Sequence, residues 1–389
     1  LGISGFAWAY GAPAYLAFCS VSLSAAIGYW LMPKIWAAGR ARALVTQADF
    51  FADHYRARWL GVVVAVVGIA ALVVYVQIQI TALGLILRMT LGTDVSPGMA
   101  AVLAAAAMLA FVFLAGLRSA AFAAGVKDVL MLVLVIALSA TVAGIVGASS
   151  MADVYARAQD AFPGIGKLPG LKADSGLSTT WLMTSALNVA LANWIFPHMF
   201  QLSYSAATED AIRRNAIFQP IYSLSYFFII LLGLAALLAG TVPPDGDINA
   251  VLLQFVSDRY PPWLVGLLAG TACLLALVPG SVLLLTAGSI FARNVVAPLR
   301  PGLSERGGLL ASRLSMVGAA AIAVYLTLGG NRSLVEIGLS AYGAIGLLAP
   351  GVFLAFVWPR TSAVAVAGGL VAGYALLVTP PGEAWIAAH

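Results

Sequence analysis

The sequence predicts an all-α polytopic membrane protein with about ten transmembrane helices. Of its 389 residues, 62% are hydrophobic and 9% are charged, and the mean hydropathy is +0.99. Soluble domains carry about 25% charged residues, so this chain has too few charged side chains to cover its surface in water. Its long apolar runs do not alternate with polar residues, as the strands of a membrane barrel would. The composition therefore excludes a water-soluble globule and favours helices that span a bilayer.

Apolar runs of about 20 residues, the length that crosses the hydrocarbon core as a helix, recur along the chain between charged residues, Pro and Gly. The expected spans are 10–33, 59–87, 98–117, 128–147, 179–203, 217–240, 262–291, 314–328, 334–357 and 361–379. The longest loop is 148–178, and Thr46 with Asp49 predicts a capping box that starts a short helix over residues 46–55. We expect residues 1–389 to form one membrane domain. Because Leu1 lies in apolar sequence with no initiator Met, we expect a fragment of a longer protein.

The basic residues indicate the orientation of these spans. Fourteen of the 20 Lys and Arg residues lie in one set of alternate loops and six lie in the other. The positive-inside rule makes the first set cytoplasmic. The net charge of +5 is explained by this topology, so no nucleic-acid partner is expected. The excess of Arg over Lys and the abundance of Ala favour a bacterial inner membrane protein.

Several classes of function are disfavoured by what the sequence lacks. Cys19 and Cys273 lie inside apolar runs, which argues against a disulfide framework or a zinc cluster. The pair Gly166-Lys167 is followed by Leu168 and lacks the earlier Gly of a phosphate-binding loop. Acidic residues are absent from the middle of the expected spans. We therefore expect no enzyme activity and no cofactor. The expected partners are a lipid bilayer and a small-molecule substrate. The oligomeric state is left open.

The span 179–203 carries the clearest sign of a functional site. About thirty residues separate Thr179 from the charged group at 209–214, near 45 Å as a straight helix, which overshoots the hydrocarbon core. Pro197 has no amide hydrogen and cannot bond the carbonyl of Asn193, so a break into two half-helices is expected. The amide end of the second half-helix would face the middle of the membrane and attract an anion. The candidate binding residues are Asn193, Trp194, Pro197, His198 and Gln201.

A simpler interpretation of this span is a proline kink whose polar residues only hydrogen-bond to a neighbouring helix. The same two interpretations apply to span 59–87, where Tyr75 and Gln79 share a face and Gln77 points elsewhere. They either line a cavity or join two helices. In span 262–291, Pro279 predicts a second break, whose free carbonyls either meet a cation or allow the helix to bend.

Several of these segments together resemble the sodium:solute symporter family. The resemblance rests on Thr46, Asp49, Phe50 and Tyr55, Tyr75 with Gln79, Gly116-Leu117-Arg118 with Asp128, Pro197-His198, and Ala349-Pro350 followed by Trp358-Pro359-Arg360-Thr361. It implies the five-plus-five inverted-repeat fold of the leucine-type transporters. Span 179–203 would then be the broken first helix of the second repeat, and the opening helix of the first repeat would be mostly missing.

Within that family, a second set of residues resembles the monocarboxylate permease branch. The set is Phe196-Pro197-His198, Arg213-Arg214-Asn215, Ala276-Leu277-Val278-Pro279 and Phe291-Ala292-Arg293-Asn294. This resemblance implies a substrate such as pyruvate or lactate. In that alignment, Val278 and Pro279 stand where many relatives hold sodium with a pair of hydroxyls, so the coupling ion is either Na+ or H+ and its ligands are unknown.

Taken together, we expect a secondary active transporter that couples a cation to the import of a short monocarboxylate by alternating access. The substrate would lie at the break near Asn193, Trp194, His198 or Gln201, with Gln79 opposite. A proline or pantothenate symporter, or a symporter-like input domain of a histidine kinase, is the alternative. A passive channel is less well supported, because no charged ring or carbonyl filter motif appears.

Overall fold

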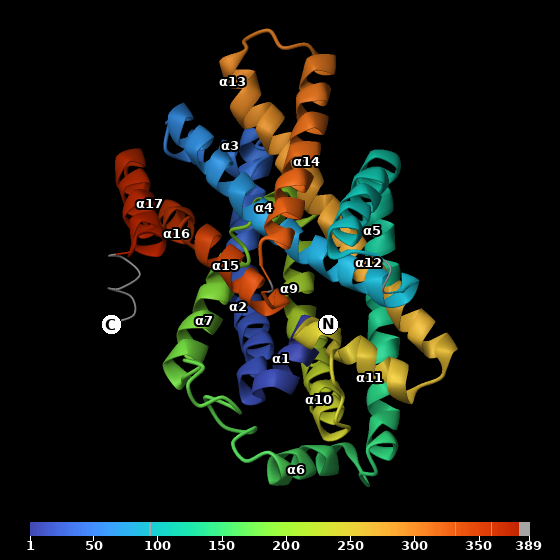
Figure 1. The fold of residues 1–389 in the computed structure, drawn as a ribbon. Coiled ribbons are helices and arrows are strands. Elements are labelled where there is room, and N and C mark those ends of the chain that lie inside the picture. The colour runs from blue at the N-terminus through green and yellow to red at the C-terminus, as the bar shows by residue number, and fades with distance from the viewer. Residues whose placement is uncertain (93–94, 331, 359, 381–389) are drawn as a thin grey trace.

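The computed structural model describes residues 1–92, 95–330, 332–358 and 360–380, with the side chains of 115–119 left undescribed, and this part of the chain is helical without strands (Figure 1). In the first half the α-helices are α1 Gly2–Tyr10, α2 Leu16–Arg42, α3 Gln47–His54, α4 Arg58–Leu91, α5 Pro97–Ile145 and α6 Met151–Ala161. In the second half they are α7 Thr179–Ala192, α8 Pro197–Ser205, α9 Glu209–Ser223, α10 Ser225–Leu238, α11 Val251–Arg259, α12 Pro262–Ile290, α13 Ala297–Leu299, α14 Glu305–Leu328, α15 Leu334–Gly346, α16 Ala349–Val357 and α17 Ala363–Val378.

The helices account for the expected membrane spans. Within the described residues, seven stretches are long and apolar enough to cross a bilayer, and α15 with α16 forms a further span bent by 42°. The remaining two expected spans correspond to the broken pair α7 and α8 and to α17, which has 16 residues. Helix α5 contains two candidate spans, Pro97–Leu114 and Ala120–Ile145, and the loop expected between them is helical. The sequence therefore predicted an all-α membrane protein correctly.

The expected break at Pro197 is confirmed. Helix α7 ends at Ala192, and α8 begins at Pro197, which occupies a first-turn position where a missing amide hydrogen costs nothing. The expected break at Pro279 is wrong, because α12 continues through it. Helix α12 packs along α4 and α5, and Gly280 lies so close to α5 that an added Cβ would be 2.6 Å from the sulfur of Met108. This close packing holds the helix together across the proline.

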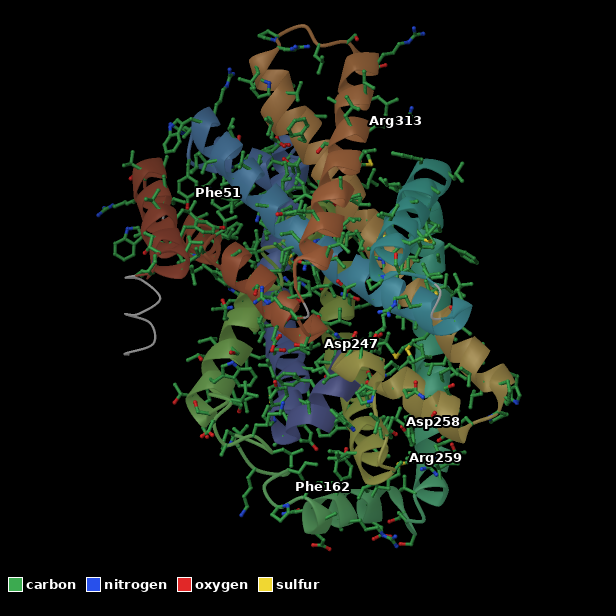
Figure 2. The ribbon with its side chains drawn as sticks, viewed as in Figure 1. Phe51, Phe162, Asp247, Asp258, Arg259 and Arg313 are labelled. Carbon is green, nitrogen blue, oxygen red and sulfur yellow. The ribbon has the colours of Figure 1, made fainter. Side chains whose placement is uncertain are left out.

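Two labelled residues mark the opposite ends of the molecule. Figure 2 places Arg313 towards the end that carries α13, and Phe162 at the opposite end beside α6. The long loop 148–178 contains the short helix α6. The predicted capping box of α3 is present: the Asp49 amide donates to the Thr46 hydroxyl at 3.0 Å, and the Thr46 amide donates to the Asp49 carboxylate at 3.1 Å.

The broken segment lies in the core of the bundle. Helices α7 and α8 both pack against α2, while α7 also contacts α15 and α8 also contacts α3 and α12. Ile195 and Phe196 are 0% and 1% exposed. Backbone groups freed by the break are therefore far from water and need partners from neighbouring elements. Of the residues that carry the family resemblance, Pro359 lies outside the described part of the chain.

Candidate functional site

The break is anchored on one side by α2. The Trp194 indole N–H donates to the Ser24 carbonyl at 2.6 Å, and the Asn193 amide nitrogen donates to the Ser24 hydroxyl at 3.1 Å. Across from α2, the Tyr342 hydroxyl of α15 donates to the Asn193 amide oxygen at 3.4 Å. Gly28 makes room for the indole, since it leaves no Cβ in the ring's place. Asn193 therefore joins α2 and α15 through the break.

The freed backbone is satisfied by a residue that the sequence had not singled out. The Gln47 side chain of α3 donates through Nε2 to the Ile195 carbonyl. Gln47 is 1% exposed, and its amide oxygen is buried with no hydrogen-bond partner. Although the neighbouring Thr46 and Asp49 drew attention as a capping box, nothing in the sequence indicates that a Gln in a short helix reaches a break about 150 residues away.

Aromatic side chains from three elements pack against the start of α8. The Tyr75 ring centroid of α4 lies 4.9 Å from that of Phe196 and 6.1 Å from that of His198. Tyr342 lies 5.3 Å from Phe196 and 6.0 Å from Tyr75. The His198 Nδ1 atom is buried without a hydrogen-bond partner. Phe196 and Tyr342 extend the pair of predicted residues, Tyr75 and His198, into one aromatic cluster.

A cavity of about 420 Å³ lies beside this cluster. Tyr75, Gln79 and Tyr342 line it, together with residues of α1, α2, α7, α10 and α12. Its polar groups are neutral: phenol hydroxyls, the Gln79 amide and serine hydroxyls such as that of Ser20. No Asp, Glu, Lys, Arg or His belongs to its lining in the described residues. Gln77 instead donates to the Leu326 carbonyl of α14 at 3.1 Å, on another face of α4 as predicted.

The other predicted binding residues lie around the break but do not line this cavity. Trp194 borders a separate hollow of about 230 Å³ next to α2. Gln201 faces α12, where its amide nitrogen donates to the Ser289 hydroxyl at 2.8 Å and its amide oxygen accepts from the Thr286 hydroxyl at 2.9 Å. Trp194 does not lie on one continuous helix with His198 and Gln201, because residues 193–196 between α7 and α8 are not helical.

No side-chain oxygen is available at the two positions where the family alignment places sodium ligands, Val278 and Pro279. The nearby hydroxyl of Ser281 donates to the carbonyl of Leu277 at 2.7 Å and is 3.3 Å from that of Met108. Within the described residues, no group of three or more His, Cys, Asp or Glu side chains is arranged to hold a metal. The described part of the chain therefore offers no acidic cage for a cation.

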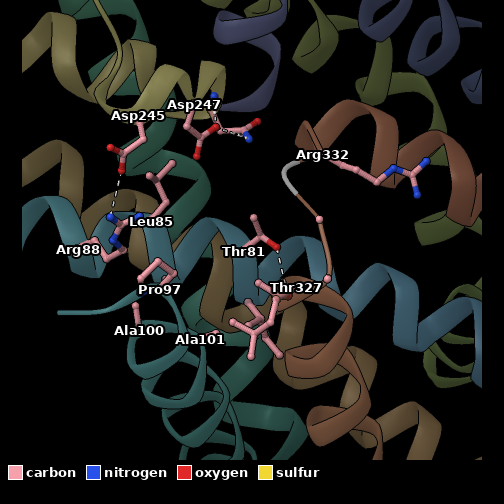
Figure 3. Close-up of a pocket in the computed structure, with 16 residues that line it drawn as sticks. Thr81, Leu85, Arg88, Pro97, Ala100, Ala101, Asp245, Asp247, Thr327 and Arg332 are labelled. Carbon is pink, nitrogen blue, oxygen red and sulfur yellow. Dashed lines mark hydrogen bonds and ion pairs between the residues drawn. The ribbon is translucent and has the colours of Figure 1, made fainter.

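A second cavity, of about 470 Å³, lies at the C-terminal ends of α4 and α14 (Figure 3). Arg88 and Asp245 form an ion pair across it at 3.2 Å. The Thr81 and Thr327 hydroxyls are 3.3 Å apart on its floor. The orientation predicted from the basic residues would put this cavity on the external side. Its charged lining distinguishes it from the neutral cavity beside the broken helix.

A buried broken helix next to a neutral polar cavity, inside a bundle of membrane-spanning helices, defines a membrane carrier of the secondary-transporter type. A sequence model described as "SSF: Sodium:solute symporter family" matches residues 1–373. The chain belongs to the sodium:solute symporter family, whose members are cation-coupled solute carriers, and it is an integral membrane protein.

Related proteins agree with this assignment. The uncharacterised symporter YhjB of Bacillus subtilis is 34% identical over 354 residues, which cover 90% of this chain and 71% of that protein. A monocarboxylate transport permease protein of Rhizobium johnstonii is 29% identical over 308 residues, covering 77% of this chain and 60% of that protein. The substrate-bound, outward-open structure of a Na+-coupled sialic acid symporter shares the fold, with a TM-score of 0.70 at 16% identity over 97% of this chain and 83% of that one.

Proposed function

We propose that this protein imports a short monocarboxylate, such as pyruvate or lactate, by symport with a cation. The observation that carries the proposal is the neutral polar cavity beside the broken helix. Within it, Tyr75 and Gln79 offer hydrogen-bond donors to a small solute, while the Tyr342 hydroxyl already donates to Asn193. The monocarboxylate permease of Rhizobium is a relative over most of the chain, which supports this substrate class.

The cavity suits a small acid in size and in charge. A water molecule takes about 30 Å³, so about 420 Å³ holds a three-carbon acid together with several waters. A carboxylate needs donors, and phenol hydroxyls and carboxamides donate without placing a permanent positive charge in the membrane. The amide end of α8, which begins at Pro197, adds the positive end of a helix dipole near the same aromatic cluster.

The coupling ion is Na+ or H+. Membership of the sodium:solute symporter family supports Na+. If Na+ is the ion, backbone carbonyls or other hydroxyls take the place of side chains at Val278 and Pro279. If H+ is the ion, the loss of both hydroxyls at these positions accompanies a change of coupling.

Ligand-induced stabilisation of the purified full-length protein tests the substrate class. A ligand that binds only the folded state adds about 2.7 kcal/mol at a concentration of 100 Kd. We expect pyruvate or lactate to raise the thermal midpoint, and Tyr75→Phe or Gln79→Leu to weaken that shift. Tyr325→Phe is the matched control, because Tyr325 is 76% exposed on α14. The proposed substrate would be overturned if proline or another solute stabilised the protein and no short monocarboxylate did.

A further inference from the structure

The short helix α3 is fixed to the end of α12 by a charged cluster. The Asp49 carboxylate accepts from Arg293 Nε at 2.8 Å and from Asn294 Nδ2 at 2.8 Å. The Thr46 hydroxyl also donates to the Asn294 amide oxygen at 2.9 Å. Arg293 and Asn294 are consecutive residues of the π-helix Phe291–Val296, which continues α12. One carboxylate therefore ties α3 to two neighbouring side chains of this segment.

The same helix reaches the broken segment. Gln47, two residues before Asp49, donates to the Ile195 carbonyl between α7 and α8. Its amide oxygen has no partner and lies near Gly68 of α4 and Pro197 at the start of α8. Helix α3 is itself held firmly, because Phe50 and Phe51 are 1% and 0% exposed.

We propose that α3 acts as a clamp that holds the end of α12 and the broken segment 193–196 in a fixed relation, with Gln47 as a positioning residue for the transport site. The effect of the clamp on transport rests on the proposed function. The contacts that α3 makes with α12 and with the broken segment do not. It gives a role to the Thr46 and Asp49 motif, which the binding cavity does not use. The charge distribution places α3 on the cytoplasmic side of the membrane.

Alternating access explains why such a clamp would matter. In alternating access one group of helices rocks against another around a fixed site, and we infer that α8 and α12, which are in contact, belong to the two groups that move apart. While Asp49 holds α12 and Gln47 holds the break, that movement is opposed. Loss of Gln47 Nε2 leaves the buried Ile195 carbonyl unpaired, which favours any arrangement that exposes it to water.

Hydrogen–deuterium exchange of the purified full-length protein tests the clamp without requiring transport. Gln47→Met keeps the side-chain length and removes the donor, and Asp49→Asn removes the charge. We expect exchange in residues 195–205 to rise about three- to tenfold in Gln47→Met, the range for one neutral hydrogen bond, and more in Asp49→Asn. The double variant should exceed Asp49→Asn only slightly, since both changes release the same clamp.

Asp53→Asn is the matched control, because Asp53 lies on α3 but pairs with Arg42 at the surface, at 2.5 Å. Its exchange in residues 195–205 should equal that of the wild type. Arg293→Gln is a milder variant at a half-exposed position, and it replaces Asp49→Asn if that protein does not fold. Unchanged exchange at 195–205 in Gln47→Met and in Asp49→Asn or Arg293→Gln would overturn the clamp.

Uptake measurements separate the clamp from the proposed function. If the wild type imports a short monocarboxylate, Gln47→Met should change the maximal rate more than the KM, because Gln47 does not line the cavity. A purely structural role would lower stability and leave the turnover of the folded protein unchanged. If no monocarboxylate is imported, the proposed substrate fails, while the exchange result still decides the clamp.

Discussion

Replacing Gly28 with alanine should disturb the broken helix from the neighbouring α2. An added Cβ would lie 2.3 Å from Cζ2, 2.4 Å from Cε2 and 2.9 Å from Nε1 of Trp194. Ordinary carbon contacts are about 3.5 to 4.0 Å, so the indole would have to retreat by roughly 1 Å. Trp194 is only 4% exposed and donates to the Ser24 carbonyl at 2.6 Å. The substitution therefore forces either the ring or the hydrogen bond to give way.

The expected cost follows from these two contributions. Overpacking a well-filled core costs about 1 to 3 kcal/mol, and weakening the Trp194 hydrogen bond adds about 1 kcal/mol. Relative to a control Gly→Ala substitution elsewhere in a helix, which has the same gain of up to about 1 kcal/mol in helix propensity, a total of about 2 to 4 kcal/mol corresponds to a decrease of roughly 30- to 1,000-fold in the folding equilibrium constant. Asn193 adjoins Trp194, shares its anchor on Ser24 and accepts from Tyr342, which lines the cavity, so we also expect a weaker affinity for the transported solute.

Denaturant unfolding of the purified full-length protein, followed by solute binding, measures both effects. Gly318→Ala is the matched control, since nothing lies within 4 Å of an added Cβ there. In the middle of α14 this substitution should stabilise by up to about 1 kcal/mol through helix propensity. Adding Trp194→Phe to Gly28→Ala should recover part of the lost stability by removing ring volume. A Gly28→Ala protein with unchanged stability and binding would refute the packing argument.

Two further predictions concern pH and the contact between α8 and α12. Burial, and then the charge of Arg42, lower the pKa of His54 below its usual 6.5, against the opposing charge of Asp53. The unfolded chain therefore binds the proton more readily, so the contribution of His54 to stability should fall as the pH drops below about 6.5 and be constant above it. Thermal midpoints from pH 8 to 5 check this, and His54→Asn should show a smaller fall. Gln201→Leu removes two hydrogen bonds to α12 and should lower stability by about 1 to 2 kcal/mol with little change in solute affinity; a tenfold loss of affinity would place Gln201 in the binding site instead.

Much of the fold could be predicted because membrane spans leave a strong pattern in the sequence. Apolar runs of the right length and the distribution of basic residues indicate helices and their orientation. Pro197 indicated its break because a proline cannot bond the preceding turn. The same reasoning failed at Pro279, where packing of Gly280 against Met108 keeps α12 continuous. Proline thus marks a weak point, and tertiary packing decides whether the helix opens there.

The site was harder to predict because it combines residues from distant elements. The spacing of Tyr75 and Gln79 put both on one face of α4, and both line the neutral cavity beside the broken helix. Trp194 lies beside α2 and Gln201 bonds to α12, so these two predicted residues lie apart from that cavity. Gln47 and Tyr342 had no local pattern to indicate them, since their partners Ile195 and Asn193 lie 148 and 149 residues away along the chain.

The central claim is that the protein drives a short monocarboxylate across the membrane with a cation gradient. Uptake of labelled pyruvate and lactate into proteoliposomes, with an imposed Na+ gradient and separately an imposed pH gradient, measures this directly. We predict saturable accumulation under one of the two gradients, with a strong loss in Gln79→Leu, because Gln79 lines the cavity, and none in Tyr325→Phe. Accumulation under neither gradient would contradict it.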